Sequence, residues 1–148
     1  MTVTFCGHKT IANPEVVKDW LRQVVDSLID DGADTFYLGG YGQFDSLAAS
    51  IIYDLKQQYP LIRSVLVLPY LDRQYSLESY DETLYPPIET VPRRFAILKR
   101  NEYMIKESDI VVAYVQFSYG GAYTARQYAK RKGKTIIDYP SICPSLSS

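Results

Sequence analysis

"RSVLVLPY", residues 63–70, decides the fold class, because it is apolar at nearly every position rather than at every second one. A strand with one face in solvent alternates apolar and polar residues, whereas a strand of a parallel sheet is covered on both faces. Four more strand-like stretches flank it, and helical patterns separate them. The expected strands are residues 2–8, 34–40, 63–70, 110–117 and 134–140, and the expected helices are residues 13–32, 44–60, 92–109 and 120–133.

This alternation predicts an α/β fold: a Rossmann-like three-layer sandwich with a mostly parallel five-stranded sheet and helices on both faces. Right-handed crossovers favour the strand order 3-2-1-4-5. Ligands of such sheets bind beyond the carboxyl ends of the strands, near the point where the order reverses. The 148 residues fit one domain, 1–148, in which residues 71–91 form a loop insertion and residues 140–148 a tail.

The composition excludes several classes of protein. The chain is 47% hydrophobic and 22% charged, which favours a packed core over disorder. No apolar run approaches the roughly 20 residues that a membrane helix needs, and the start, "MTVTFCGHK", is not typical of a secretory signal. Cys6 and Cys143 suggest neither a disulfide framework nor a metal site. We therefore expect a cytoplasmic protein without a membrane partner.

The net charge of −1 is unevenly distributed along the chain. Residues 1–92 contain 6 Lys and Arg against 13 Asp and Glu, and residues 93–148 contain 10 against 4. The excess of cations in the second part, "KRKGK" at 130–134 included, fits either a solvated helix face or the handling of an anion. The whole chain is not basic enough to predict general nucleic-acid binding.

Three predicted strand ends carry residues that suit a ligand. Glycine lets backbone N–H groups approach a ligand closely, and the N-terminus of a helix attracts phosphate. An ordinary tight turn is the structural alternative for each glycine pair, and the spacing matches neither the dinucleotide fingerprint nor a Walker P-loop. The candidate residues are Gly7 and His8 after the first strand, Gly39, Gly40, Gly42 and Asp45 after the second, and Gly120, Gly121 and Thr124 after the fourth.

The predicted helix at 92–109 supplies cations. Arg93 and Arg100 are seven residues apart and share a face, and Arg94 and Asn101 form a neighbouring row. The planar guanidinium group matches phosphate, although a surface ion pair is the alternative for each arginine.

These residues predict a binding site with divided roles. Gly120, Gly121 and Thr124 would hold a phosphate that Arg100 neutralises, with Asn101 beside it. A ribose or second phosphate would lie on the backbone of residues 39–42. Asp45 would accept a hydrogen bond from a ribose hydroxyl or act as a catalytic base. His8 would contact the ligand or make a structural hydrogen bond. Three tyrosines would stack on a base or simply pack within the protein: Tyr41, Tyr119 and Tyr123.

Four blocks of the sequence, "TFCGHK", "GGYGQFD", "KRNEYMIKESDIVVAY" and "GGAYTARQYAKRKGKTII", resemble the SLOG superfamily, above all its small YpsA-type members. The resemblance spans about residues 2–139. It implies a Rossmann-like fold, a nucleotide or nucleotide-derived ligand, and self-association. The Lonely-guy branch hydrolyses nucleoside monophosphates, and the DprA branch binds single strands. Residues 119–127 resemble the Lonely-guy motif Pro-Gly-Gly-x-Gly-Thr-x-x-Glu but lack its proline, third glycine and catalytic glutamate.

The missing glutamate favours binding over hydrolysis. The main hypothesis is a protein that binds a nucleotide-derived signal, and senses or sequesters it in bacterial or phage conflict. The alternative enzyme is an N-glycosidase or phosphoribohydrolase in which Asp45 replaces the glutamate. A third hypothesis is a module for nucleic-acid ends or protein partners. No cofactor is expected, although Asp45 and a phosphate could share Mg²⁺, and the expected partners are a small nucleotide-derived molecule and a second copy of the chain.

Overall fold

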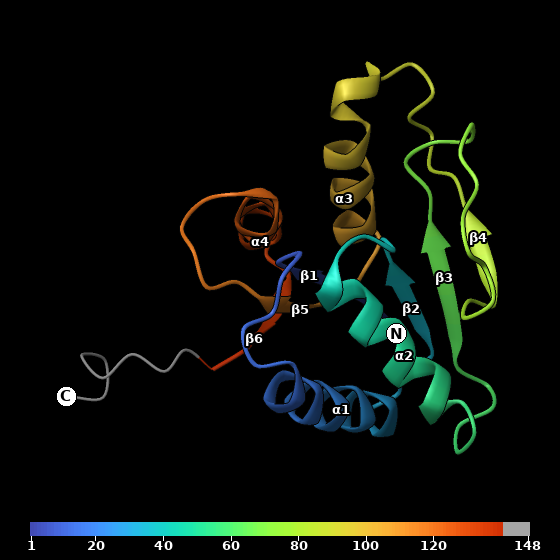
Figure 1. The fold of residues 1–148 in the computed structure, drawn as a ribbon, viewed down its shortest axis with the longest axis vertical. Coiled ribbons are helices and arrows are strands. Elements are labelled where there is room, and N and C mark those ends of the chain that lie inside the picture. The colour runs from blue at the N-terminus through green and yellow to red at the C-terminus, as the bar shows by residue number, and fades with distance from the viewer. Residues whose placement is uncertain (141–148) are drawn as a thin grey trace.

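The computed structural model describes residues 1–140, which form one parallel sheet with helices packed against it (Figure 1). The strand order is β4-β3-β2-β1-β5-β6. The strands are β1 (Thr2–Gly7), β2 (Thr35–Leu38), β3 (Arg63–Val67), β4 (Glu82–Leu84), β5 (Ile110–Tyr114) and β6 (Thr135–Asp138), and the helices are α1 (Pro14–Asp30), α2 (Gln43–Leu55), α3 (Ala96–Lys106) and α4 (Gly121–Arg131), with a single 3₁₀ turn, η1 (Arg93–Phe95). The predicted tail beyond residue 140 lies outside the described residues, and so does Cys143.

The predicted α/β class is confirmed, but the predicted number of strands is wrong. The five expected strands are present in the expected order, and β4 adds a sixth at the edge, inside the segment predicted as a loop at 71–91. The Asp81 carboxylate anchors this segment, because it accepts a hydrogen bond from the Ser64 backbone N–H (2.9 Å) and pairs with Lys56 Nζ (2.8 Å). A three-residue edge strand is too short to show a period in the sequence.

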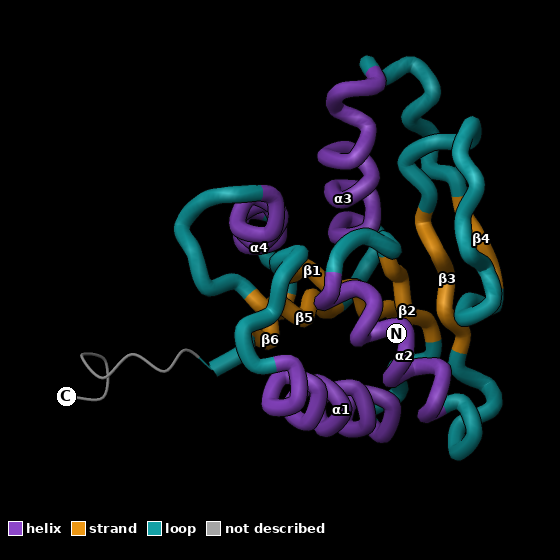
Figure 2. The backbone as a smooth tube through the Cα atoms, in the orientation of Figure 1, coloured by secondary structure: helices purple, strands orange, loops and turns teal. Residues whose placement is uncertain are grey.

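The two faces of the sheet bury their side chains under different helices. Phe5, Phe36 and Leu38 point toward α1 and α2 and form the largest core cluster with them. Cys6 and Ala113 point the opposite way and pack against α4 and the end of α3. Figure 2 shows the result, with α1 and α4 on opposite sides of β1, β5 and β6. Because successive side chains of a strand face opposite layers and both layers are covered, most side chains of β1, β2, β3 and β5 are buried.

The predicted helix at 92–109 begins later than expected. Pro92 precedes the 3₁₀ turn η1, and regular α-helix starts at Ala96. Arg93 therefore stands outside α3, where it pairs with Asp72 on the surface (2.9 Å). The prediction that Arg93 and Arg100 act from one helix face is wrong.

Helices α2 and α4 start with the same backbone conformation at the carboxyl edge of the sheet. Their N-cap residues, Gly42 and Gly120, have φ/ψ angles of 91°/173° and 91°/176°. The surroundings differ: a Cβ on Gly42 would lie 2.8 Å from Lys9 Cα, whereas no atom of residues 1–140 lies within 4 Å of a Cβ on Gly120. The chain therefore uses the two glycines differently, one for close packing and one at an open surface.

The substitution Gly42→Ala is expected to lower the free energy of unfolding by about 2 kcal/mol, against about 1 kcal/mol for Gly120→Ala. Both variants place alanine at positive φ, and only the first also drives a Cβ into the Lys9 backbone. Urea unfolding of the two variants measures the difference. Equal losses of stability in the two variants would show that the contact with the Lys9 backbone adds nothing to the effect of Gly42→Ala.

None of the helices within residues 1–140 combines the length and apolar content that a membrane crossing requires.

Candidate ligand-binding site

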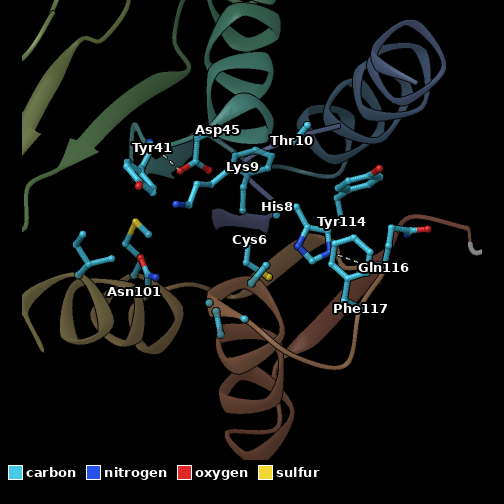
Figure 3. Close-up of a pocket in the computed structure, with 18 of the residues that line it drawn as sticks. Cys6, His8, Lys9, Thr10, Tyr41, Asp45, Asn101, Tyr114, Gln116 and Phe117 are labelled. Atoms are coloured by element: carbon cyan, nitrogen blue, oxygen red, sulfur yellow. Dashed lines mark hydrogen bonds between the residues drawn. The ribbon is translucent and has the colours of Figure 1, made fainter. Parts of the chain in front are cut away.

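A cavity of about 750 Å³ opens at the carboxyl edge of the sheet, beside the point between β1 and β5 where the strand order reverses (Figure 3). The segments that follow β1, β2 and β5 line it, together with one face of α3 and the start of α4. Seven predicted site residues lie in its wall: Gly7, His8, Asp45, Arg100, Asn101, Gly120 and Gly121. Four others, Gly39, Gly40, Gly42 and Thr124, are not among the lining residues.

The N-terminus of α4 faces this cavity without a capping group. No side chain caps the helix, and the backbone N–H groups of residues 121–123 donate to no acceptor in residues 1–140. Gly120 and Gly121 carry no Cβ, and the space around them is open. Thr124 is occupied locally, since its hydroxyl donates to the Gly120 carbonyl (3.0 Å). Free N–H groups and the positive end of the helix dipole make this wall suited to an anion.

Arg100 joins α3 to the ends of two strands. Its side chain is only 2% exposed, and Nη1 donates to the carbonyl oxygens of Gly39 (2.9 Å) and Val67 (2.8 Å). Nε donates to Oδ1 of Asn101 (2.8 Å), and the Asn101 amide nitrogen makes no hydrogen bond within residues 1–140. Nη2 makes no hydrogen bond within the described residues, and Arg100 is one of the residues that line the cavity. Arg100 therefore holds α3 against the ends of β2 and β3, and its Nη2 is the donor that remains for a ligand.

Asp45 extends from the first turn of α2 into the cavity, as Figure 3 shows. Its Oδ2 accepts a hydrogen bond from the Tyr41 backbone N–H (3.2 Å). Burial raises the pKa of Asp45 to about 6, although that hydrogen bond and the Arg100 charge both act to lower it. A carboxylate with this pKa can hold or release a proton near neutral pH.

The glycines at 39–42 serve the protein's own packing. A Cβ on Gly39 would lie 3.1 Å from both Arg100 Cζ and Asp45 Oδ2, and a Cβ on Gly40 would lie 2.7 Å from a Leu66 methyl group. Their lack of side chains allows the guanidinium and the carboxylate to approach one strand end from two sides. The structure therefore gives a reason for these glycines that requires no ligand.

Replacing Asp45 with asparagine is expected to change how stability depends on pH. The pKa of Asp45 is about 6 in the folded protein and about 3.8 in the unfolded chain, so the folded state binds the proton more tightly. The stability that this proton contributes is present below about pH 4 and is lost as the pH rises to about 6. Urea unfolding from pH 4 to pH 7 should show the free energy of unfolding of Asp45→Asn rising by about 2 kcal/mol relative to that of the wild type across this window. A difference that stays constant with pH would contradict the assignment.

His8 begins a ladder of aromatic rings at the other side of the cavity. Its Nε2 accepts a hydrogen bond from the Gln116 backbone N–H (2.7 Å), so the neutral ring carries its proton on Nδ1. Burial lowers the pKa of His8, which favours the same neutral form. The centres of the Phe117 and His8 rings are 4.5 Å apart, and the Tyr119 ring stacks on Phe117 with 5.3 Å between the ring centres.

Sequence reasoning missed several lining residues. Lys9 is the most consequential, because its Nζ lies 5.1 Å from the centre of the Tyr41 ring and enters the cavity in Figure 3. Its position directly after Gly7 and His8 was the available signal. Cys6 also lies in the wall, where burial raises the pKa of its thiol to about 12 and keeps it protonated. Of the three tyrosines predicted to stack, Tyr41 and Tyr119 line the cavity, and Tyr123 does not.

Comparison with known proteins gives distant relatives over most of the chain. No protein-family model matches the sequence. It is 20% identical over 138 residues to a UPF0398 protein of Bacillus pumilus, which covers 85% of this chain and 73% of that protein. It is 27% identical over 146 residues to the uncharacterized SPbeta prophage-derived protein YoqJ of Bacillus subtilis, which covers 80% of this chain and 84% of YoqJ.

Among solved structures, DNA processing protein A from Helicobacter pylori has a similar fold, with a TM-score of 0.69 at 18% identity over 97% of this chain and 67% of that chain. The relatives and the fold are thus consistent with a resemblance to the SLOG superfamily. Each of the four sequence blocks contributes residues to the cavity wall: His8 and Lys9 after β1, Asp45 at the start of α2, Arg100 on α3, and Gly120 and Gly121 at the start of α4.

Proposed function

We propose that the cavity binds a nucleotide or a nucleotide-derived ligand. The observation that carries the proposal is the uncapped N-terminus of α4, which opens on a cavity of about 750 Å³ that also holds cations and exposed rings. Cavities of this size accommodate small organic ligands. A phosphate can accept hydrogen bonds from the free N–H groups, and a base can stack on the exposed aromatic rings.

The residues divide into complementary groups. Gly120 and Gly121 present the backbone N–H groups, while Lys9 and Nη2 of Arg100 bring positive charge toward the same space. Oδ1 of Asp45 makes no hydrogen bond within residues 1–140 and is suited to accept one from a ribose hydroxyl. A phosphorylated nucleoside therefore fits this set better than a neutral molecule of the same size.

The relatives bear on the biological setting. YoqJ is prophage-derived, which supports a role for this chain in sensing or sequestering a nucleotide signal during conflict between bacteria and phages. The Helicobacter pylori protein is described by its single-stranded DNA binding mode. This makes an oligonucleotide a ligand worth testing here, against the expectation of no nucleic-acid partner. Self-association stays part of the proposal, as the resemblance implies.

A second candidate function is hydrolysis of the N-glycosidic bond. The observation that favours it is the pKa of about 6 at Asp45, a carboxylate that points into the cavity and can act as a base near neutral pH. Asp45 would then act in place of the catalytic glutamate of the Lonely-guy motif, which this sequence lacks.

Incubation with a panel of nucleotides separates these functions. The protein is mixed with nucleoside mono-, di- and triphosphates, with and without Mg²⁺, and its melting temperature and the released products are measured. A rise in melting temperature with the nucleotide recovered intact supports binding, whereas free base, absent in Asp45→Asn, supports hydrolysis. Stabilisation by oligonucleotides alone, with steep salt dependence, would contradict the small-ligand proposal.

A further inference from the structure

The aromatic rings of the cavity form two separate groups. Tyr41 stands on the loop after β2, next to Asp45. His8, Phe117 and Tyr119 form the ladder on the loops after β1 and β5. Figure 3 shows Tyr41 on the α3 side of the opening and the His8–Phe117 pair on the opposite side. A ligand with two planar bases can use both groups at once.

The exposure of these rings indicates that the core does not require them. Tyr41 is 53% exposed, Phe117 is 50% exposed and Tyr119 is 70% exposed. One face of Tyr41 meets Lys9 Nζ, and Tyr119, the last ring of the ladder, meets no ring in residues 1–140 other than Phe117. Each group therefore keeps a flat surface on which a planar ring can stack.

The space between the two groups suits negative charge. Figure 3 places Lys9 between Tyr41 and the His8–Phe117 pair. The start of α4 with its free N–H groups and the Arg100–Asn101 pair line the same cavity. The order that Figure 3 shows across the cavity is therefore the Tyr41 ring, the Lys9 cation and the His8–Phe117 rings. A molecule with two bases joined by phosphate has the matching order.

We infer that the ligand contains two nucleobases linked through phosphate, with one base on Tyr41 and the other on Tyr119. This inference rests on the proposed function and narrows it from nucleotides to dinucleotides. Stacking on an exposed ring strengthens binding of each base by roughly tenfold or more.

Calorimetric titration of the full chain tests this with matched ligands. Diadenosine diphosphate and diguanosine diphosphate are compared with ADP and GDP, which carry the same bases and phosphates but lack the second nucleoside. For at least one base, the two-base compound should bind more than tenfold tighter, which exceeds the factor of about two that its symmetry alone provides. In Tyr41→Ala and in Tyr119→Ala this ratio should fall to about two.

Tyr53 supplies the matched control, because it is 54% exposed on α2 and does not line the cavity. Tyr53→Ala should keep the wild-type ratio, and Tyr119→Phe should keep it because the ring remains. A wild-type ratio of two or less with measurable ADP or GDP binding would overturn the dinucleotide inference and leave the proposed function standing. A high ratio that survives both Tyr41→Ala and Tyr119→Ala would overturn the assigned contacts, and failure of all four ligands to bind would contradict the proposed function itself.

Discussion

Replacing Arg100 with alanine is expected to lower the free energy of unfolding by about 4 kcal/mol. The substitution leaves the buried carbonyl oxygens of Gly39 and Val67 without their donor and opens space where a 2% exposed side chain stood. Each unsatisfied buried acceptor is destabilising by about 1–3 kcal/mol. In thermal unfolding the loss should appear as a decrease of about 10 °C in the melting temperature.

Arg93→Ala is the matched control. Arg93 is also an arginine paired with the protein, but its partner is the exposed carboxylate of Asp72. Exposed pairs contribute about 0–1 kcal/mol, so this variant should unfold close to the wild type. If the two variants lost the same stability, Arg100 would not be the tie between α3 and the strand ends.

This contrast shows what the sequence could and could not reveal about the arginines. Helical spacing placed Arg93 and Arg100 on one face, and nothing local distinguishes them. The acceptors of Arg100 are 61 and 33 positions away along the chain. Its burial follows from the meeting of α3 with the ends of β2 and β3, which is a property of the tertiary structure.

The glycines show a similar limit. The sequence correctly indicated that residues 39–42 and 120–121 would lie at one edge of the sheet. It could not tell that Gly39 and Gly42 make room for Asp45, Arg100 and Lys9, whereas Gly120 and Gly121 face open space. Both kinds of glycine look alike in sequence, since the difference depends on which segments approach them.

Most strands were easier to predict than the edge strand β4 and the residues of the cavity wall. Stretches rich in apolar and β-branched residues are sufficient to identify β1, β2, β3, β5 and β6, and all of these except β6 have mostly buried side chains. Strand β4 depends instead on side-chain anchors such as Asp81. The ring of Phe117 was predicted as part of a strand, and its place in the ladder follows from the bend of the chain between β5 and α4.

The substitution Gly121→Asp is expected to weaken nucleotide binding about 100-fold. A carboxylate at the first position of α4 would occupy the N–H groups assigned to phosphate and repel it. The fold should tolerate the change, because a Cβ on Gly121 meets no atom of the described residues within 4 Å and acidic residues stabilise helix N-termini. Calorimetric titration of a bound nucleotide measures the loss, and thermal unfolding checks that the variant is as stable as the wild type.

Gly121→Asn is the matched control for size. Asparagine has nearly the same shape without the negative charge, so its affinity should fall about tenfold or less. Equal losses in both variants would indicate steric exclusion rather than competition between anions. Unchanged affinity in Gly121→Asp would place the phosphate away from α4.

The most direct test of the account compares nucleosides with their 5′-monophosphates on the wild-type protein. Calorimetric titration with adenosine, guanosine, cytidine and uridine and the corresponding monophosphates measures the contribution of the phosphate alone. At least one monophosphate should bind about 30-fold tighter than its nucleoside, because charge-assisted hydrogen bonds to the start of α4 and to Lys9 exist only when the phosphate is present. Equal affinity for every pair, or no binding by any monophosphate, would contradict the claim that this cavity recognises a phosphorylated nucleoside.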